Sequence, residues 1–419
     1  MSRAAVFFLQ ALLVVGLPYF LWRICRMRRV MPMVVVQILV GIVLGHSVFG
    51  QLSPHWWSVL FGPAQLSMLA GLQWLAVTLF CFLTGLHLRE MEVDARPHIV
   101  LAVSVGSIVL PMAAGTAAGA WLGTVLPLAA GAHVGLYWFA IAVGVCAAVT
   151  ALPVLGAILD EMRMHGTRLG SLALACAAVN DGLIWVLLTI ILVGHGYGEG
   201  MQLGTMLALA VAYLAAFGLL VRPALAWLTR GKALDTEPLL ILALLLIFTS
   251  ALAAEMSGLH HVLGGFIAGL VWPRHLAHRV RQHLEPATMA ALLPFFFLYA
   301  GLRADISIGG REAITIFVVS LAVSVASKIV GVAVPGRIAG LGWRQALALG
   351  SLLQTKGLVE LVVLAILFDA GIIGSAAFSG LLLMAVASTV LARPLTEAVL
   401  GVRDQGRPAE WAAKRASES

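Results

Sequence analysis

The chain has 419 residues, of which 61% are hydrophobic and only 11% are Asp, Glu, Lys or Arg. Soluble domains usually carry about 25% charged residues, so this sequence lacks the polar surface that would coat a water-soluble particle of its size. A membrane-spanning helix needs ~20 predominantly apolar residues, and the apolar content suffices for about 13 spans. The sequence therefore excludes a soluble globule and predicts an all-α polytopic membrane protein.

Hydropathy predicts 13 transmembrane helices along the chain when it is averaged over windows of about 19 residues. They are expected at residues 4–22, 30–45, 66–88, 98–126, 134–159, 168–193, 202–221, 237–255, 258–272, 288–302, 313–336, 345–368 and 374–392. The second and ninth are short enough to be tilted packing elements rather than full spans.

The distribution of positive charge predicts the orientation. If the N-terminus lies outside, 21 of the 26 Lys and Arg residues fall in cytoplasmic loops or the C-terminal tail, and only Arg3, Arg303 and Arg311 lie outside. The remaining two, Lys328 and Lys356, lie inside predicted spans. This asymmetry follows the positive-inside rule and predicts a cytoplasmic C-terminus. Because the formal net charge of +7 is spread over many short loops, it does not indicate a nucleic-acid partner.

A weak internal repeat relates the two halves of the chain. Residues 82–86 (Phe-Leu-Thr-Gly-Leu) resemble residues 297–302 with one residue inserted, and residues 41–44 resemble residues 269–272. Each pair lies seven predicted spans apart. Since seven is odd, the two copies would cross the membrane in opposite senses, which predicts the inverted repeats of many secondary transporters.

Charged residues near the middle of predicted spans need a reason, because each costs roughly 2.5–3.5 kcal/mol on insertion scales. Asp181 lies in span six, Lys328 in span eleven, and Lys356 in span twelve, four residues before Glu360. One interpretation is that the buried Lys and Asp residues pair only to stabilise the helix bundle. The other is that they form an ion or proton pathway.

Two predicted spans carry helix-breaking sequences at matching positions, again seven spans apart. Span five contains Thr150 and Pro153, and span twelve contains Gln354, Thr355 and Gly357. Interrupted helices free backbone carbonyls and amides that can replace the hydration shell of an ion, so paired breaks are typical of a transporter site. The alternative interpretation of the proline is a packing kink.

No other pattern indicates a cofactor, a resident metal or an enzyme. Cys25, Cys81, Cys146 and Cys176 have no close pairs, and we interpret them as small apolar residues. We interpret the pair 260–261 (His-His), which has only one carboxylate at ligand spacing, as structural. The sequence contains no nucleophile elbow, Walker motif or metalloprotease helix.

Residues 150–155 (Thr-Ala-Leu-Pro-Val-Leu) and 177–181 (Ala-Ala-Val-Asn-Asp) resemble the monovalent cation:proton antiporter superfamily. The resemblance is nearest to plant-type cation/proton exchangers and to the membrane domain of bacterial glutathione-gated potassium efflux antiporters. It covers nearly the whole membrane region and is most specific over residues 146–188. Further matching stretches are residues 82–86, 258–270, 294–303 and 356–361.

The resemblance implies a sodium/proton-antiporter-like fold in a homodimer. A core domain around helices 4–6 and 11–13 would contain two crossed discontinuous helices, and the remaining helices of residues 1–400 would form a dimerisation domain. A short polar cytoplasmic tail would occupy residues 401–419. The sequence ends without the cytosolic nucleotide-binding domain of the potassium efflux branch, so such regulation would require a separate cytosolic subunit. The expected location is the bacterial inner membrane.

The resemblance also implies roles for individual residues. Asp181 would take either a proton or a cation, with Asn180 as its neighbour and Thr150 as the polar residue of the first interrupted helix. Lys328 matches the core lysine. The basic and acidic positions of the second interrupted helix match Lys356 and Glu360. The Asn-Asp pair resembles the electroneutral pattern, whereas the core lysine resembles the electrogenic branch.

These residues predict exchange of H⁺ for Na⁺ or K⁺ by competition at Asp181. Burial favours the neutral carboxyl and a nearby cation favours the charged carboxylate, so the two ligands would alternate on one group. Asn180 and Thr150 would complete a shell of oxygen ligands, Lys328 would hold the empty carboxylate charged, and Lys356 would offset a half-helix dipole. The alternatives are a uniport channel or proton-coupled exporter of an organic solute, and a non-transporting membrane sensor.

Overall fold

The computed structural model describes residues 2–24, 33–90, 96–126, 129–131, 134–164, 167–195, 203–230, 235–304 and 310–401. Cys25 and nearly all of the predicted tail lie outside these ranges. Within them the chain is helical, and the one β-type contact is an isolated bridge between Ala130 and Ile373. The predicted all-α class is therefore confirmed.

The helices follow one another along the chain with short connections. They are α1 Arg3–Arg23, α2 Met33–Leu44, α3 Pro54–Phe61, α4 Pro63–Glu90, α5 Pro97–Val125, α6 Leu136–Ala148, α7 Leu152–Glu161, α8 Arg168–His195, α9 Leu203–Ala216, α10 Arg222–Leu228, α11 Thr236–Met256, α12 His261–Val271, α13 Arg274–Ala287, α14 Leu293–Arg303, α15 Gly310–Ile338, α16 Trp343–Leu353, α17 Leu358–Asp369 and α18 Ser375–Leu400. Three π-helical segments interrupt them at His46–Gly50, Phe217–Val221 and Thr288–Leu292.

Ten helical segments in the described residues are long and apolar enough to cross a membrane. Helices α6 and α12 are apolar but shorter. A helix occupies each of the 13 predicted segments, but the number of membrane crossings stays a prediction because several segments are short or interrupted.

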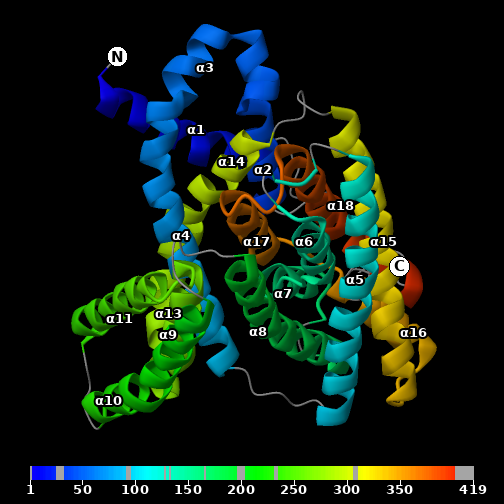
Figure 1. The fold of residues 1–419 in the computed structure, drawn as a ribbon. Helices are drawn as coiled ribbons and strands as arrows, with labels where there is room; N and C mark the ends of the chain where they lie inside the picture. Colours follow the sequence, from blue (N-terminus) through cyan, green and yellow to red (C-terminus); the bar gives the residue numbers. More distant parts are fainter. Residues whose placement is uncertain are drawn as a thin grey trace, which may run out of the picture.

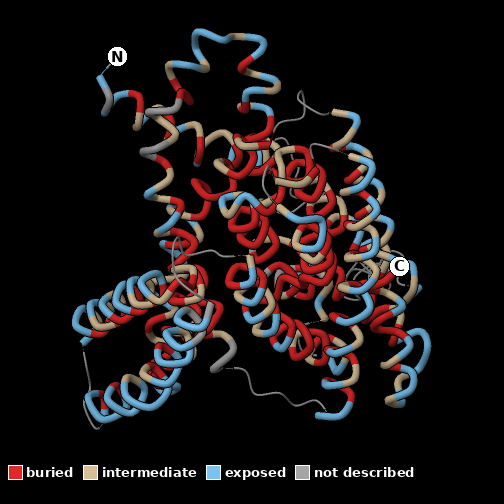
Figure 2. Tube along the Cα trace, viewed as in Figure 1, coloured by how far each residue is buried: buried red, intermediate tan, exposed pale blue. Residues whose placement is uncertain are grey.

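The helices pack in two sets (Figure 1). Helices α5–α8 and α15–α18 form one compact set, which we call the break bundle because it contains both interrupted helices. Helices α1–α4 and α9–α14 form the other set, which we call the flanking helices. The largest buried region lies where the break bundle meets α2, α4, α12 and α14, while the outer faces of α9–α11 are exposed (Figure 2). The assignment of these sets to a core domain and a dimerisation domain stays a prediction.

The repeat noted in the sequence corresponds to two helix crossings of the same kind. Gly41 of α2 meets Gly301 of α14, where a Cβ added to Gly41 would lie 2.9 Å from the Gly301 Cα. Gly85 of α4 meets Gly269 of α12 in the same way, at 3.0 Å. In the aligned repeats Gly41 corresponds to Gly269 and Gly301 to Gly85. The two crossings are therefore one contact made twice, as an inverted repeat requires.

Some helices lie in segments that hydropathy left as loops, among them α3, and the longest of these helices is α13. Hydropathy left residues 273–287 in a loop before span ten, whereas the structure forms α13 there and continues it through a π-helical segment into α14. The helix is rich in Arg and His, so its mean hydropathy is low. It buries only the stripe of Leu276, Ala277 and Val280, and this stripe holds it against its neighbours.

Candidate functional site

The two interrupted helices meet at their breaks inside the break bundle. The first break separates α6 from α7 and the second separates α16 from α17. The backbone N–H of Ala151 donates to the Thr355 carbonyl at 2.9 Å, and the Thr150 hydroxyl donates to the Leu353 carbonyl at 2.8 Å. Thr150 and Thr355 are both fully buried. The predicted break residues of the two halves are therefore in direct contact.

The proline of the first break lies at a helix start rather than within a kinked helix. Pro153 is the second residue of α7. The first N–H groups of a helix have no partner inside that helix, so a proline here removes no helical hydrogen bond. The interpretation as a packing kink is therefore wrong.

Asp181 lies on α8 and is fully buried. The carboxylate lies near the backbone amide of Leu152, where α7 begins, and near the Lys328 ammonium. Neither Asp181 oxygen accepts a close hydrogen bond from a residue that the structure describes. A buried carboxylate is normally hydrogen-bonded, so two unsatisfied oxygens indicate a place for a ligand.

Asn180, the preceding residue, connects α8 to two other helical segments. Its side-chain nitrogen donates to the Ser107 hydroxyl of α5 at 2.7 Å and to the Thr150 hydroxyl of the first break at 3.4 Å. Its side-chain oxygen is buried without a hydrogen-bond partner among the described residues. Residues 180 and 181 thus carry three buried oxygens without donors, and such oxygens can bind a cation.

Two buried lysines lie at the carbonyl end of α6. The Lys328 ammonium of α15 donates to the Ala148 carbonyl at 2.5 Å and to the Ser107 carbonyl at 2.9 Å. The Lys356 ammonium of the second break donates to the Cys146 carbonyl at 2.5 Å and to the Ala147 carbonyl at 3.2 Å. Positive charge at the C-terminal end of a helix offsets its dipole.

The lysine contacts differ in part from those expected. Lys356 also lies 3.3 Å from Glu360, as the spacing of four residues predicted, and both side chains are buried. No ion pair within 4.0 Å joins Lys328 to Asp181 in the described structure, because the ammonium of Lys328 is directed at backbone carbonyls. Gln354 is fully buried, and both polar atoms of its side chain lack partners within the described ranges.

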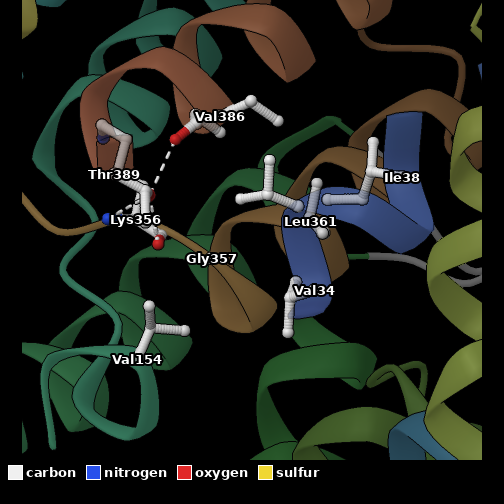
Figure 3. A pocket seen from close by; sticks show the side chains of 10 residues that line it. Val34, Ile38, Val154, Lys356, Gly357, Leu361, Val386 and Thr389 are labelled. Carbon is white, nitrogen blue, oxygen red and sulfur yellow. Dashed lines mark hydrogen bonds between the residues drawn. The ribbon is translucent and has the colours of Figure 1, made fainter. Parts of the chain in front are cut away.

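Helix α18 holds the backbone of the second break. The Lys356 N–H donates to the Thr389 hydroxyl at 3.1 Å, and this hydroxyl donates to the Lys356 carbonyl at 2.5 Å. Figure 3 shows both residues beside a small pocket whose other walls include Val154 of α7 and Val34 and Ile38 of α2. The pocket therefore lies between the second break and a flanking helix.

Several residues of this network were missed in the sequence. Besides Ser107 and Thr389, Ser324 of α15 donates to the Ala147 carbonyl at 3.2 Å, and Ser388 donates to the Gln354 carbonyl at 2.8 Å. The available signal was small polar residues spaced three or four apart in apolar helices, as at positions 320, 324 and 327. Such residues are typical of helix interfaces in membranes.

Glu255 at the end of α11 and the histidines His260 and His261 at the start of α12 do not join the site. Glu255 accepts a hydrogen bond from the His261 backbone N–H at 2.7 Å, and the His260 ring accepts one from the Val262 N–H at 3.3 Å. These side chains therefore bind the start of α12. Among the described residues no group of three or more His, Cys, Asp or Glu side chains is placed to hold a metal ion.

Comparisons with known proteins show which family the chain resembles. The family model for the transmembrane sodium/hydrogen exchanger matches residues 11–400. K(+)/H(+) antiporter 1 of Saccharomyces cerevisiae is 31% identical, over 88% of this chain and 43% of its own length. Cation/H(+) antiporter 19 of Arabidopsis thaliana is 30% identical, over 90% of this chain and 47% of its own length. The chain thus spans about half the length of these relatives.

Two further proteins match this chain over nearly their whole length. Na(+)/H(+) antiporter NhaS4 of Synechocystis is 29% identical over 87% of this chain and 90% of its own length. The solved structure of the sodium proton antiporter MjNhaP1 from Methanocaldococcus jannaschii superposes with a TM-score of 0.69 at 16% identity, covering 96% of this chain and 98% of that one. The superposition shows that the fold is shared.

Proposed function

Because the chain belongs to the sodium/hydrogen exchanger family of the monovalent cation:proton antiporter superfamily, we propose that it exchanges Na⁺ or K⁺ for H⁺ across a membrane at Asp181. The observation that carries this proposal is the Asp181 carboxylate, which is fully buried beside two crossed helix breaks and accepts no close hydrogen bond from the described residues. A proton or a desolvated cation would satisfy its oxygens.

In the proposed mechanism the two ligands exclude one another. A bare carboxylate in a buried site is costly, so the site favours an occupied state with either a proton or a cation. The side-chain oxygen of Asn180 would supply a further ligand, and carbonyl oxygens can replace the hydration shell of a monovalent ion. Occupation by one ligand at a time couples their movements in opposite directions.

The lysines would keep the break rigid in this mechanism. Lys328 and Lys356 together hydrogen-bond to the last carbonyls of α6, and Glu360 offsets the charge of Lys356. These bonds would prevent the carbonyls from competing with Asp181 for the cation. The hydroxyl of Thr150, already used in two hydrogen bonds, would bind a cation only by its remaining lone pair.

Alternating access would require the break bundle to move against the flanking helices, which would form the scaffold of a homodimer. The pocket beside Lys356 lies at the boundary between these two sets (Figure 3). Relatives are named for K⁺, for Na⁺ and, in GerN of Bacillus cereus, for both. Both cations are therefore included in the proposal.

The test is transport by the purified protein in vesicles with an internal pH indicator. We expect addition of Na⁺ or K⁺ to dissipate an imposed pH gradient, and we expect Asp181→Asn to abolish the effect because the amide cannot bind a proton or carry a charge. The rates of dissipation measured with Li⁺ and with Rb⁺, added separately, show the cation selectivity. Dissipation of the gradient by Asp181→Asn at the wild-type rate would refute exchange at this carboxylate, and movement of a cation without proton movement would indicate a uniport.

A further inference from the structure

Ser107 of α5 contacts both Asn180 and Lys328, the two residues of the site that accompany the buried Asp181 carboxylate. Helix α5 itself contributes no charged residue to the site. The Ser107 side-chain hydroxyl accepts the Asn180 amide N–H at 2.7 Å, and its backbone carbonyl accepts the Lys328 ammonium at 2.9 Å. The side chain is fully buried. One residue therefore holds both partners through separate atoms.

The direction of the hydrogen bonds around Asn180 follows from the carbonyls that accept the hydroxyl hydrogens of Ser107 and Thr150. The Ser107 hydroxyl donates its only hydrogen to the Ser104 carbonyl at 2.9 Å, and the Thr150 hydroxyl donates its hydrogen to the Leu353 carbonyl at 2.8 Å. A hydroxyl has one hydrogen and two lone pairs, so each can only accept from Asn180. Both contacts must therefore be made by the amide NH₂ group.

This assignment leaves the side-chain oxygen of Asn180 as the atom without a partner. If the amide were flipped, its oxygen would face the lone pairs of two hydroxyls, which is repulsive, and its NH₂ group would lie where a cation is expected. The observed orientation instead leaves a buried acceptor without a donor on the residue next to Asp181 in the chain. An amide oxygen of this kind can coordinate a cation.

We propose that Ser107 is a positioning residue that fixes the orientation of Asn180 and so sets the affinity for the transported cation. This inference rests on the proposed exchange at Asp181. Loss of the Ser107 hydroxyl would leave the Asn180 amide held only by the Thr150 contact at 3.4 Å, which is near the limit of a hydrogen bond. Cation binding then weakens because the amide spends part of its time flipped.

The test compares Ser107→Ala with Ser104→Ala in the vesicle transport assay. Ser104 is a matched control: it lies one turn away on α5, is fully buried, and its hydroxyl has no hydrogen-bond partner among the described residues. We expect Ser107→Ala to raise the apparent KM for the cation roughly 3- to 10-fold, as loss of one buried hydrogen bond allows. We expect the maximal rate to stay as in the wild type.

A double-mutant cycle separates positioning from general loss of structure. If Ser107 acts through Asn180, then Ser107→Ala adds no further rise in KM to protein that already carries Asn180→Ala. Additive effects, or equal KM values in Ser107→Ala and Ser104→Ala, would overturn the inference. Asp181→Asn in the same assay keeps the two proposals apart: if it abolishes exchange while Ser107→Ala has no effect on KM, only the role of Ser107 is wrong.

Discussion

The Arg303 guanidinium of α14 and the Asp369 carboxylate of α17 form an ion pair of 2.6 Å between the flanking helices and the break bundle. The guanidinium carbon also lies 4.7 Å from the centre of the Phe368 ring. Asp369 ends the half-helix that begins after the second break, so the pair and the break lie at opposite ends of α17. The side chains are 24% and 45% exposed, and such partly solvated pairs contribute only about 0–1 kcal/mol. A contact this weak could open in each cycle of the proposed transport.

Covalent locking of this contact is predicted to stop transport. If alternating access separates α17 from α14, a reducible thiol cross-linker joining Arg303→Cys to Asp369→Cys prevents the separation. Transport measured in vesicles is expected to be lost on cross-linking and restored on reduction. Each single cysteine variant treated with the same reagent is the control. Full transport by the cross-linked protein would show that these two helices stay together during exchange.

Within the buried pair of Lys356 and Glu360, substitution of the lysine is predicted to destabilise the protein more than substitution of the glutamate. Lys356→Met removes the partner of a buried carboxylate and leaves carbonyls of α6 without their donor, so a loss of roughly 3–5 kcal/mol is expected. Glu360→Gln leaves the ammonium bonded to those carbonyls and is expected to cost less. Melting temperatures in detergent measure the difference, and equal melting of the two variants contradicts the assigned contacts.

The glycine crossings predict a contrast within one helix. Gly85→Ala in α4 places a methyl group 3.0 Å from the Gly269 Cα, where only backbone could yield, and overpacking of this kind typically costs about 1–3 kcal/mol. Gly71→Ala in the same helix meets no atom within 4 Å. It is expected to be neutral or slightly stabilising. Thermal unfolding of both variants tests this, and comparable destabilisation would exclude a tight crossing at Gly85.

The sequence predicted those parts of the molecule in which the residue type alone indicates the local structure. Long apolar segments predicted the helices. The carboxylates of Asp181 and Glu360 stood out because a charge in an apolar helix is costly. Thr150 and Gly357 marked the breaks because a polar residue and a glycine stand out in the middle of apolar predicted spans. The glycines of the repeat proved to lie at close helix crossings.

The parts that the sequence did not predict depend on how helices rotate and cross. Serine is a common residue in membrane helices, and only the crossing of α5 with α8 makes Ser107 a partner of Asn180. The carbonyl partners of Lys328 come from backbone, which has no signature in sequence. Helix α13 escaped detection because an amphipathic helix rich in Arg and His has the average hydropathy of a loop.

The most direct test of exchange at a single carboxylate is proton release on cation binding by the purified protein in weakly buffered detergent. We predict that adding Na⁺ or K⁺ releases protons, and that the apparent Kd of the cation weakens about tenfold for each unit that the pH falls while the site is protonated. Asp181→Asn is predicted to release none. Equal proton release from Asp181→Asn and wild type, or a cation affinity independent of pH, would contradict competition at Asp181.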